Sequence, residues 1–411
     1  MVGDNGGAAF ILIYIAASLF LSVPIFFAEF IIGRRSGANC LGAMRKLASG
    51  SIWKGLGVLC ILTPTIILSY YAVVGGWSLA YLMKSFTLAF PSFGSFTASP
   101  WASVTAFAVY MAISCLIVVC GVKKGIEAFS KLALPVLFVL IVALAVYSVC
   151  LPGGKPGIEY LLKPDWGKVG ARTFVNAIGQ SFYSISLGMG IIITYASYIS
   201  KKENVIFSGV GTAGFDLFFA LLAGFAIMPA VFAAGIEPGA GPGLVFDTLP
   251  FIFGRMGEAS PIVGTVVSVS FFLTVTIAAL TSSVSLIEVP VAWLTEERGI
   301  RRGNATLIVF CVTGLIGALC ALGFGPLAGV QIFGHGIFDA FDLLCCNILL
   351  PIGGILCVLF VGWKMNRAEV WDEFTNGGSL RFNSRIFGFV LFLLRYLAPV
   401  AVAVIFLSNF I

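Results

Sequence analysis

The sequence predicts an all-α polytopic membrane protein. Hydrophobic residues make up 59% of the 411 residues and charged residues only 10%, and the mean hydropathy is +1.06. This composition excludes a soluble domain, because soluble domains carry far more charge. Apolar runs long enough to cross a bilayer recur along the whole chain. One of these runs is interrupted by small and hydroxyl-bearing residues, which indicates a discontinuous helix inside the membrane.

We expect ten membrane spans, each long enough to cross the hydrocarbon layer. They lie at residues 9–32, 55–84, 101–121, 128–150, 174–199, 205–234, 260–294, 304–324, 331–362 and 386–409. Connectors rich in proline and glycine follow the second, fourth and sixth spans, at residues 91–100, 151–157 and 235–250. The last connector is long enough to form a re-entrant cap over one face.

The basic residues of the loops give the orientation. The loops after the first, third, fifth, seventh and ninth spans hold 17 of the 24 lysines and arginines. The richer side is cytoplasmic by the positive-inside rule, so the N-terminus starts outside. A Met1 placed outside and directly before a span is unusual for a native start. We therefore expect the reading frame to extend upstream and to encode a preceding helix.

The chain carries no enzyme constellation in its sequence. Its ten cysteines show no metal-like spacing with the single histidine, His335, and most lie inside apolar segments, where cysteine behaves as a small hydrophobe. No nucleophile–base pair, nucleotide loop or metal cluster is apparent. We expect no catalytic residues, no cofactor and no nucleic-acid partner, and the net charge of +6 reflects the basic membrane loops.

The fifth span contains the stretch that most strongly suggests a function. Within Gly179–Tyr198, the residues Ser184, Ser186, Gly188 and Gly190 fall close together, and each weakens a helix. Unsatisfied backbone groups are costly in lipid, so such a break survives where it lines a cavity or where a ligand supplies partners. It therefore predicts a binding site at mid-membrane depth. The alternative is a kinked structural helix with small residues for close packing.

Several acidic residues lie inside the spans and are functional candidates by default. They are Glu29, Asp216, Glu288, Asp339 and Asp342. Asp216 has no basic residue nearby in sequence, so its carboxylate would be neutralised or would meet a cation. A protonated aspartate bonded to a neighbouring helix is the alternative. Glu29, and Arg395 in the last span, are interpreted as structural.

Two further stretches offer hydroxyl groups. Residues 278–283, AALTSS, provide hard oxygen donors that suit a small cation such as Na⁺, although packing between helices is the commoner use of such residues. Tyr70 and Tyr71 follow Pro64 in a long span and can place a hydroxyl in a cavity. A buried tyrosine with a satisfied hydroxyl is the equal alternative. His335 is interpreted as a loop or packing residue.

Taken together, these stretches resemble the neurotransmitter:sodium symporter family, and in particular its bacterial amino-acid transporters. The matching pieces, in the family's order, are DNGGAAFILIY at 4–14, EFIIGRRSG at 29–37, PTIILSYYAVVGGW at 64–77, GVKKGIEAFSKLALP at 121–135, the stretch at 179–198, AALTSSVSLIEVP at 278–290 and FDAFD at 338–342. The resemblance implies two inverted five-helix repeats with discontinuous helices. Residues 1–150 would form the remainder of the first repeat, residues 151–363 the second, and residues 364–411 an extra C-terminal helix. The family's first helix would be missing.

The resemblance also implies roles for individual residues. The substrate site would comprise Ile67, Tyr71, Tyr183, Ser184, Ser186, Met189, Ser282 and Leu286, with Tyr71 holding the substrate carboxylate and Tyr183 acting as a lid. One sodium site would use Ser184 and Asp216, and a second would use the Ala278 carbonyl, Thr281 and Ser282. The outer gate would comprise Gln180 and Asp342, and the inner gate Tyr198 and Glu296.

Some positions depart from the family pattern. Tyr183 and Met189 stand where the family's leucine transporter has phenylalanines, so substrate size does not carry over. Asp216 stands where the family usually has asparagine, and Glu296 where it usually has aspartate. The sequence thus predicts a sodium-coupled amino-acid symporter of the bacterial inner membrane, working by alternating access. The alternatives are a proton-coupled amino-acid transporter of similar fold and a non-transporting helical fragment.

Overall fold

The computed structural model describes residues 2, 5–48, 52–236 and 241–408. Within these residues, nine helical segments are long and apolar enough to cross a membrane. The remaining span of the ten expected, at 174–199, is divided between the shorter helices α9 and α10. Met1, whose predicted position was outside, is not among the described residues.

The first part of the chain forms four of the long segments. The helices are α1 (Ala8–Ala17), the π-helix η1 (Ser18–Ser22), α2 (Val23–Ser36), α3 (Cys40–Leu47), α4 (Lys54–Ser85), α5 (Phe93–Ala98), α6 (Pro100–Val119), the π-helix η2 (Val122–Glu127) and α7 (Ala128–Val149). Helix α2 ends at Gly37 in the left-handed conformation, which suits a residue without Cβ. Helix α6 begins with Pro100, where a missing N–H costs nothing.

The middle part contains the break. The helices are α8 (Lys155–Leu162), the 3₁₀-helix η3 (Trp166–Lys168), α9 (Ala171–Ser184), α10 (Ile191–Ser197), α11 (Val205–Ala233), the π-helix η4 (Leu244–Thr248) and α12 (Leu249–Ala259). The predicted interruption of the fifth span is confirmed, because residues 185–190 separate α9 from α10. The predicted re-entrant cap at 235–250 is helical where described, from η4 into α12.

The last part completes the bundle. The elements are α13 (Pro261–Arg298), α14 (Arg302–Leu322), β1 (Gln331–Ile332), β2 (His335–Gly336), α15 (Ile337–Leu343), the π-helix η5 (Leu344–Leu349), α16 (Leu350–Leu359), the π-helix η6 (Phe360–Lys364), α17 (Arg367–Thr375), α18 (Arg381–Phe392), the π-helix η7 (Leu393–Leu397) and α19 (Ala398–Ser408). Strands β1 and β2 pair as an antiparallel hairpin. The predicted span 331–362 therefore starts later, at Ile337, and His335 lies in the hairpin as the loop interpretation expected.

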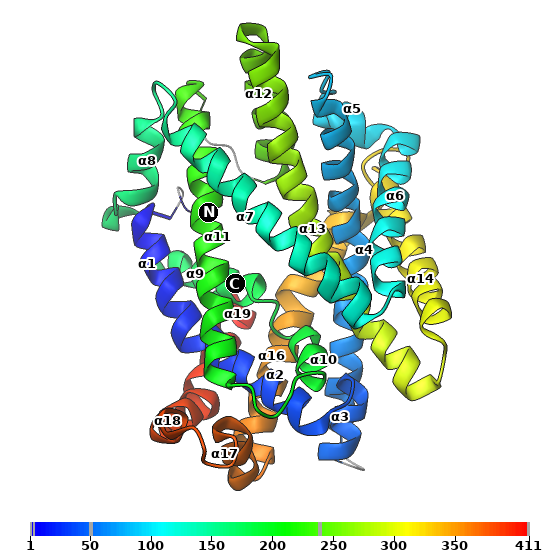
Figure 1. The fold of residues 1–411 in the computed structure, drawn as a ribbon, viewed down its shortest axis with the longest axis vertical. Coiled ribbons are helices and arrows are strands. Elements are labelled where there is room, and N and C mark those ends of the chain that lie inside the picture. Colours follow the sequence, from blue (N-terminus) through cyan, green and yellow to red (C-terminus); the bar gives the residue numbers. More distant parts are fainter. Residues whose placement is uncertain (1, 3–4, 49–51, 237–240, 409–411) are drawn as a thin grey trace.

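The helices form one bundle with distinct ends. Helix α13 packs along α4, α11 along α7, and α10 against α2. Figure 1 shows α3, α17 and α18 at one end and α5, α8 and α12 at the other. The first end carries the basic loops, so we call it the inner end and the opposite one the outer end.

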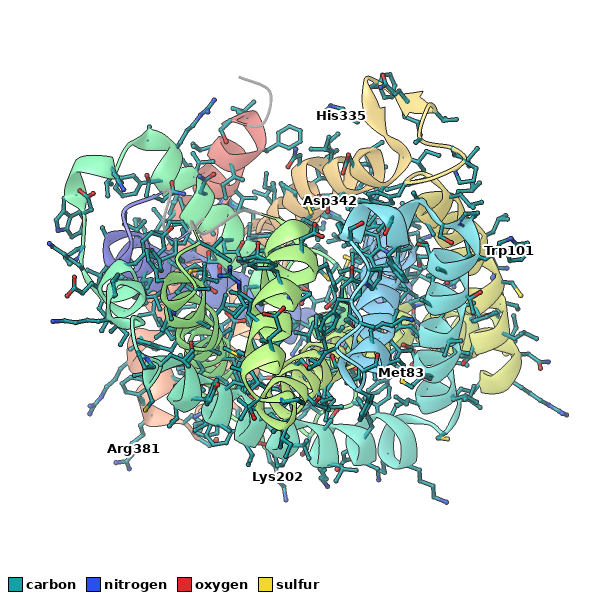
Figure 2. The ribbon with its side chains drawn as sticks, turned by 90° about the horizontal axis from the view of Figure 1, so that it is seen from above. Met83, Trp101, Lys202, His335, Asp342 and Arg381 are labelled. Carbon is teal, nitrogen blue, oxygen red and sulfur yellow. The ribbon has the colours of Figure 1, made fainter. Side chains whose placement is uncertain are left out.

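The circumference of the bundle is apolar. Seen from the outer end, side chains project all round it (Figure 2), and Trp101 and Arg381 stand at its edge. Trp101 is 84% exposed and Phe207 80% exposed, which is costly in water and favourable in lipid. Arg395, inside the last span, donates from Nε to the Gly362 carbonyl at 2.6 Å, as its structural interpretation predicted.

Candidate functional site

The break between α9 and α10 is built by left-handed backbone. Ser186, Gly188 and Gly190 have φ angles of 60°, 78° and 70°, so the helix cannot continue through residues 185–190. Gly188 also meets α16 closely, because a Cβ at Gly188 would lie 2.3 Å from the Leu350 carbonyl oxygen. The glycines therefore allow both the turn and the approach of α16.

A buried carboxylate holds the middle of the break. Glu29 of α2 is fully buried, and its Oε1 accepts from the Gly188 N–H at 2.6 Å. This contact satisfies a backbone donor that the broken helix leaves free. The other oxygen, Oε2, has no hydrogen-bond partner among the described residues. Glu29 pairs with backbone, as its structural interpretation expected, but its partner could not be identified from sequence because it lies 159 residues away.

The residues predicted for the first sodium site meet at the outer side of the break. The Ser184 hydroxyl donates to Asp216 Oδ1 at 2.6 Å, and the Tyr14 hydroxyl donates to Asp216 Oδ2 at 2.7 Å. Tyr14 lies on α1 and was missed, because a tyrosine in an apolar run gives no distinct signal. The three side chains gather four oxygen atoms of the hard type that Na⁺ prefers. Sodium binding here stays a prediction.

The residues predicted for the second sodium site occupy one turn of α13. The Thr281 hydroxyl donates to the Ala278 carbonyl oxygen at 2.8 Å. Ser282 is exposed within the structure, and α13 packs along α4, which carries Tyr71. The predicted cation donors and the predicted substrate-carboxylate residue therefore share one region between α4 and α13.

The predicted apolar lining is buried in the same core. Ile67 is 2% exposed, and Met189 and Leu286 are each 4% exposed. All three belong to one continuous hydrophobic cluster, against which Tyr71 packs. Tyr183, the predicted lid, is 36% exposed at the end of α9, and Ser186 is half-buried inside the break.

The predicted outer-gate acid has an unpredicted partner. The Cys346 thiol donates to Asp342 Oδ1 at 3.3 Å and lies 3.9 Å from the Tyr70 hydroxyl. Gln180 is half-buried on α9, and in the described part of the chain no hydrogen bond joins it to Asp342.

The two residues predicted for the inner gate, Tyr198 and Glu296, make separate contacts. The Tyr198 hydroxyl donates to Glu288 Oε1 at 2.9 Å. Glu288 is fully buried and forms an ion pair with Arg302, whose Nε donates to the Val118 carbonyl at 2.8 Å. Glu288 was recognised as an acid inside a span, but its pairing with Arg302 across a helix–helix turn was missed.

Glu296 is bound to α3 instead. Its Oε2 accepts from the backbone N–H of Asn39 at 2.8 Å and from the Asn39 side-chain amide at 2.9 Å. The neighbouring acid, Glu297, forms an ion pair with Arg45 near the end of α3. Two adjacent acids of α13 therefore hold both ends of α3, a contact that sequence spacing alone could not indicate.

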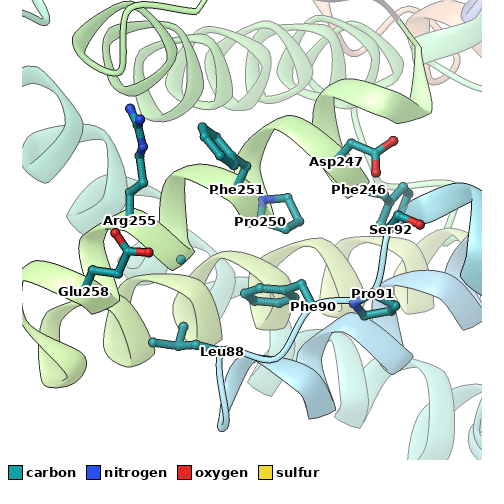
Figure 3. Close-up of a pocket in the computed structure, with 11 residues that line it drawn as sticks. Leu88, Phe90, Pro91, Ser92, Phe246, Asp247, Pro250, Phe251, Arg255 and Glu258 are labelled. Carbon is teal, nitrogen blue, oxygen red and sulfur yellow. The ribbon is translucent and has the colours of Figure 1, made fainter.

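A pocket of about 300 Å³ lies outside this site, at the outer end (Figure 3). It separates the loop after α4, with Phe90 and Pro91, from η4 and α12, with Phe251 and Arg255. No predicted site residue lines it. We therefore place the functional site at the break between α9 and α10, where the predicted residues converge.

Comparison with known proteins identifies the family. The sequence profile of the Sodium:neurotransmitter symporter family matches residues 1–107 and 100–411. The uncharacterized sodium-dependent transporter YhdH of Bacillus subtilis (strain 168) is 34% identical over 417 residues, which cover 99% of this chain and 91% of the relative. An uncharacterized sodium-dependent transporter of Haemophilus influenzae is 33% identical over 429 residues, covering 100% and 92%.

A solved structure shares the fold. The crystal structure of MhsT in complex with L-phenylalanine superposes with a TM-score of 0.89 at 38% identity, covering 99% of this chain and 93% of MhsT. The profile match and the identities to sodium-dependent transporters span nearly the whole chain. The chain belongs to the sodium:neurotransmitter symporter family.

Proposed function

We propose that this protein is a sodium-coupled amino-acid symporter. Sodium would bind beside the break between α9 and α10 and complete the substrate site there. The inward sodium gradient would then drive uptake as the outer and inner gates open in turn. Ile67, Tyr183, Met189 and Leu286 would line the side-chain pocket, with Ser186 near the substrate and Tyr71 on its carboxylate.

One observation supports the proposal: the broken helix carries residues of the predicted first sodium site and of the predicted substrate site. Ser184 contacts Asp216 at its outer side, and Met189 within it belongs to the same core as Ile67 and Leu286. A broken membrane helix supplies free backbone groups that can hold a small zwitterion. The related MhsT structure contains L-phenylalanine, which supports an amino acid as the substrate.

The substrate would be a medium-to-large apolar amino acid. Met189 and Leu286 offer an apolar lining, and methionine adapts its shape to different side chains. The partly exposed Tyr183 adds a hydroxyl that would tolerate a polar tip. We place the protein in the bacterial inner membrane, with the amino acid, sodium and lipid as its partners.

Uptake into proteoliposomes tests the proposal. Labelled leucine, methionine, phenylalanine, tyrosine and glycine are offered to the full-length protein with an inward sodium gradient or with choline replacing sodium, at equal pH on both sides. We expect uptake of an apolar amino acid only with sodium. Uptake of glycine alone would contradict the substrate class, and uptake that ignores sodium would contradict the coupling.

Proton coupling is the second candidate, and one observation favours it. Asp216 contacts only neutral hydroxyls, from Tyr14 and Ser184, and an acid in that setting can exchange a proton. A pH gradient imposed without sodium separates the two candidates. Uptake driven by the pH gradient would support proton coupling and contradict sodium coupling. No uptake under either gradient would favour a helical assembly that does not transport.

A further inference from the structure

The first residues of α3 form a bridge between α13 and the break. Asn39 caps α3, because its side-chain oxygen accepts from the N–H groups of Leu41 and Gly42 at 3.1 Å each. The other side of the same amide donates to Glu296 of α13. Asn39 is 1% exposed, so a single rotamer serves both contacts.

The next residue reaches the break itself. The Cys40 thiol is 3.3 Å from the Gly190 carbonyl oxygen, to which it donates, and 3.6 Å from the Thr194 hydroxyl. Gly190 is the last residue of the break and the N-cap of α10. Cys40 is 1% exposed, so this contact is shielded from solvent.

The contact is also tight. A Cβ built on Gly190 would lie 2.6 Å from the Cys40 sulfur and 2.7 Å from the Cys60 carbonyl oxygen. Cys60, whose carbonyl oxygen makes this contact, is fully buried. We call Cys40 and Cys60 the thiol socket. Gly190 has no room to move toward this socket. A displacement of α3 toward Gly190 would therefore also displace the start of α10.

Helix α13 therefore holds both ends of α10. Glu288 holds its C-terminal end directly, through Tyr198. Glu296 holds its N-terminal end through Asn39 and the thiol socket. A change at the inner end thus has a contiguous physical route to the residues around the substrate break.

We propose that Asn39 and Cys40 are positioning residues that couple closure of the inner end to binding at the break. Glu296 fixes Asn39, Asn39 fixes the start of α3, and Cys40 fixes Gly190 in the conformation that ends the break. The proposal rests on the proposed sodium-coupled transport. It predicts reciprocity: loosening Asn39 weakens sodium binding, and sodium protects the thiol socket from reagents.

Asn39→Asp isolates the link. Aspartate is as good an N-cap as asparagine, so α3 keeps its cap, but the donor to Glu296 is replaced by a second carboxylate. We expect the sodium concentration for half-maximal uptake to rise by about fivefold or more, as is usual for coupled sites. The double variant Asn39→Asp with Glu296→Gln restores a hydrogen bond with the donor and acceptor exchanged, and should return to within about twofold of wild type.

A second readout does not depend on transport. Cys60 alkylation by N-ethylmaleimide is followed by peptide mass spectrometry in membranes, with sodium or choline. We expect sodium to slow alkylation in the wild type, faster alkylation in Asn39→Asp, and recovery in the double variant. Unchanged alkylation and sodium dependence in Asn39→Asp would overturn the proposal, as would a double variant that is no better than the single one.

The Cys40 contact has its own matched series. Cys40→Ser keeps a donor to Gly190, Cys40→Ala removes it, and Cys357→Ala removes a buried thiol that does not contact Gly190. We expect the sodium requirement to rise about threefold or more in Cys40→Ala and to stay within about twofold in Cys40→Ser, since a hydrogen bond contributes modestly. Cys357 neighbours Cys60, so Cys357→Ala should have an effect between these two. Equal effects of serine and alanine would show that only packing matters and would overturn the role of Cys40. This series decides the matter if Asn39→Asp fails to accumulate in membranes.

Failure of the inference is distinguishable from failure of the proposed function. If the wild type takes up no amino acid with sodium, the proposed function fails. Alkylation of Cys60 still tests the link from Asn39 to the thiol socket in that case. If the wild type transports and every variant behaves like it, the coupling inference alone fails.

Discussion

The inner and outer ends of the molecule are held by different forces. In the described part of the chain, the ion pairs that join separate helices all lie at the inner end. They are Arg34–Glu373, Arg35–Glu369, Arg35–Asp372, Arg35–Glu373, Arg45–Glu297 and Arg302–Glu288. The outer end is held by aromatic packing instead. Trp77 contacts the rings of Phe93, Phe246, Phe324 and Phe338 there.

The difference shows which end is closed in this structure. Glu288 is fully buried beneath Arg302 and Tyr198, whereas Asp342, the acid predicted for the outer gate, is half-buried and Tyr183, the predicted lid, is 36% exposed. Buried charge pairs are specific but costly to break, while a thiol on a partly exposed acid is weak. The inner end is therefore closed, and the contacts around Asp342 are the looser of the two.

Among the substitutions that test the difference between the two ends, Arg302→Ala should have the largest effect. Arg302→Ala leaves Glu288 as a buried charge with Tyr198 as its remaining partner. Removing one member of a fully buried ion pair lowers the stability of the folded protein by about 3–5 kcal/mol. Arg302 is 24% exposed at its side chain, so we expect the lower end of that range. Sodium-driven uptake should fall by more than tenfold, and Cys60 should become open to alkylation.

The control for this variant lies one residue away. Arg301 is exposed in the same connection between α13 and α14, so Arg301→Ala removes the same charge without touching Glu288. It should keep uptake within about twofold, as surface substitutions usually do. Equal losses in both variants would mean that loop charge, not the buried pair, closes the inner end.

These contacts show what sequence can and cannot supply. The hydropathy and the Ser/Gly interruption predicted the spans and the break, because both are local properties of the chain. Tyr14, Asn39 and Arg302 were missed because their partners lie 202, 257 and 14 residues away and each residue type is ordinary at its own position. The start of the span at 331–362 was wrong because the apolar run includes a β-hairpin at its beginning.

Asp216 lies between the two ends, and its substitution should have the next largest effect. We expect wild-type uptake to be independent of chloride, because the fixed carboxylate supplies the negative charge beside the cations. Asp216→Asn keeps the size and removes the charge, so the apparent sodium affinity should fall by about tenfold, or about 1.4 kcal/mol. Sodium-dependent uptake, measured with gluconate and with chloride as the anion, gives both the chloride dependence and the apparent sodium affinity.

Two results would count against this role of Asp216. Wild-type uptake that collapses in gluconate would show that chloride is needed despite the carboxylate. An Asp216→Asn variant with unchanged sodium affinity in both anions would show that the carboxylate does not face a cation. Partial recovery of the variant by chloride would support the charge argument.

Tyr183 tests the outer side, where we expect a smaller effect. Tyr183→Phe keeps the ring and removes the hydroxyl of a residue that is already 36% exposed. Affinity for leucine and methionine should stay within about threefold, since one hydrogen bond contributes about 1 kcal/mol or less. Competition binding against tyrosine measures the effect on a polar-tipped substrate. A loss of more than tenfold for leucine would show that the hydroxyl, not the ring, forms the lid.

The smallest effect should come from the outer-gate thiol. Cys346→Ala removes the donor to Asp342 and the neighbour of Tyr70. Cys346 and Asp342 are both only half-buried, so water can replace the lost contact, and a thiol is a weak donor to begin with. We expect less than a twofold change in half-maximal sodium or substrate concentration. Cys40→Ala removes the equivalent atom at the inner end, where the acceptor is buried and water has no access, and it should have the larger effect. If Cys346→Ala proved the more damaging of the two, the outer gate would be the tightly coupled end, and the assignment of closure to the charged inner end would have to be reversed.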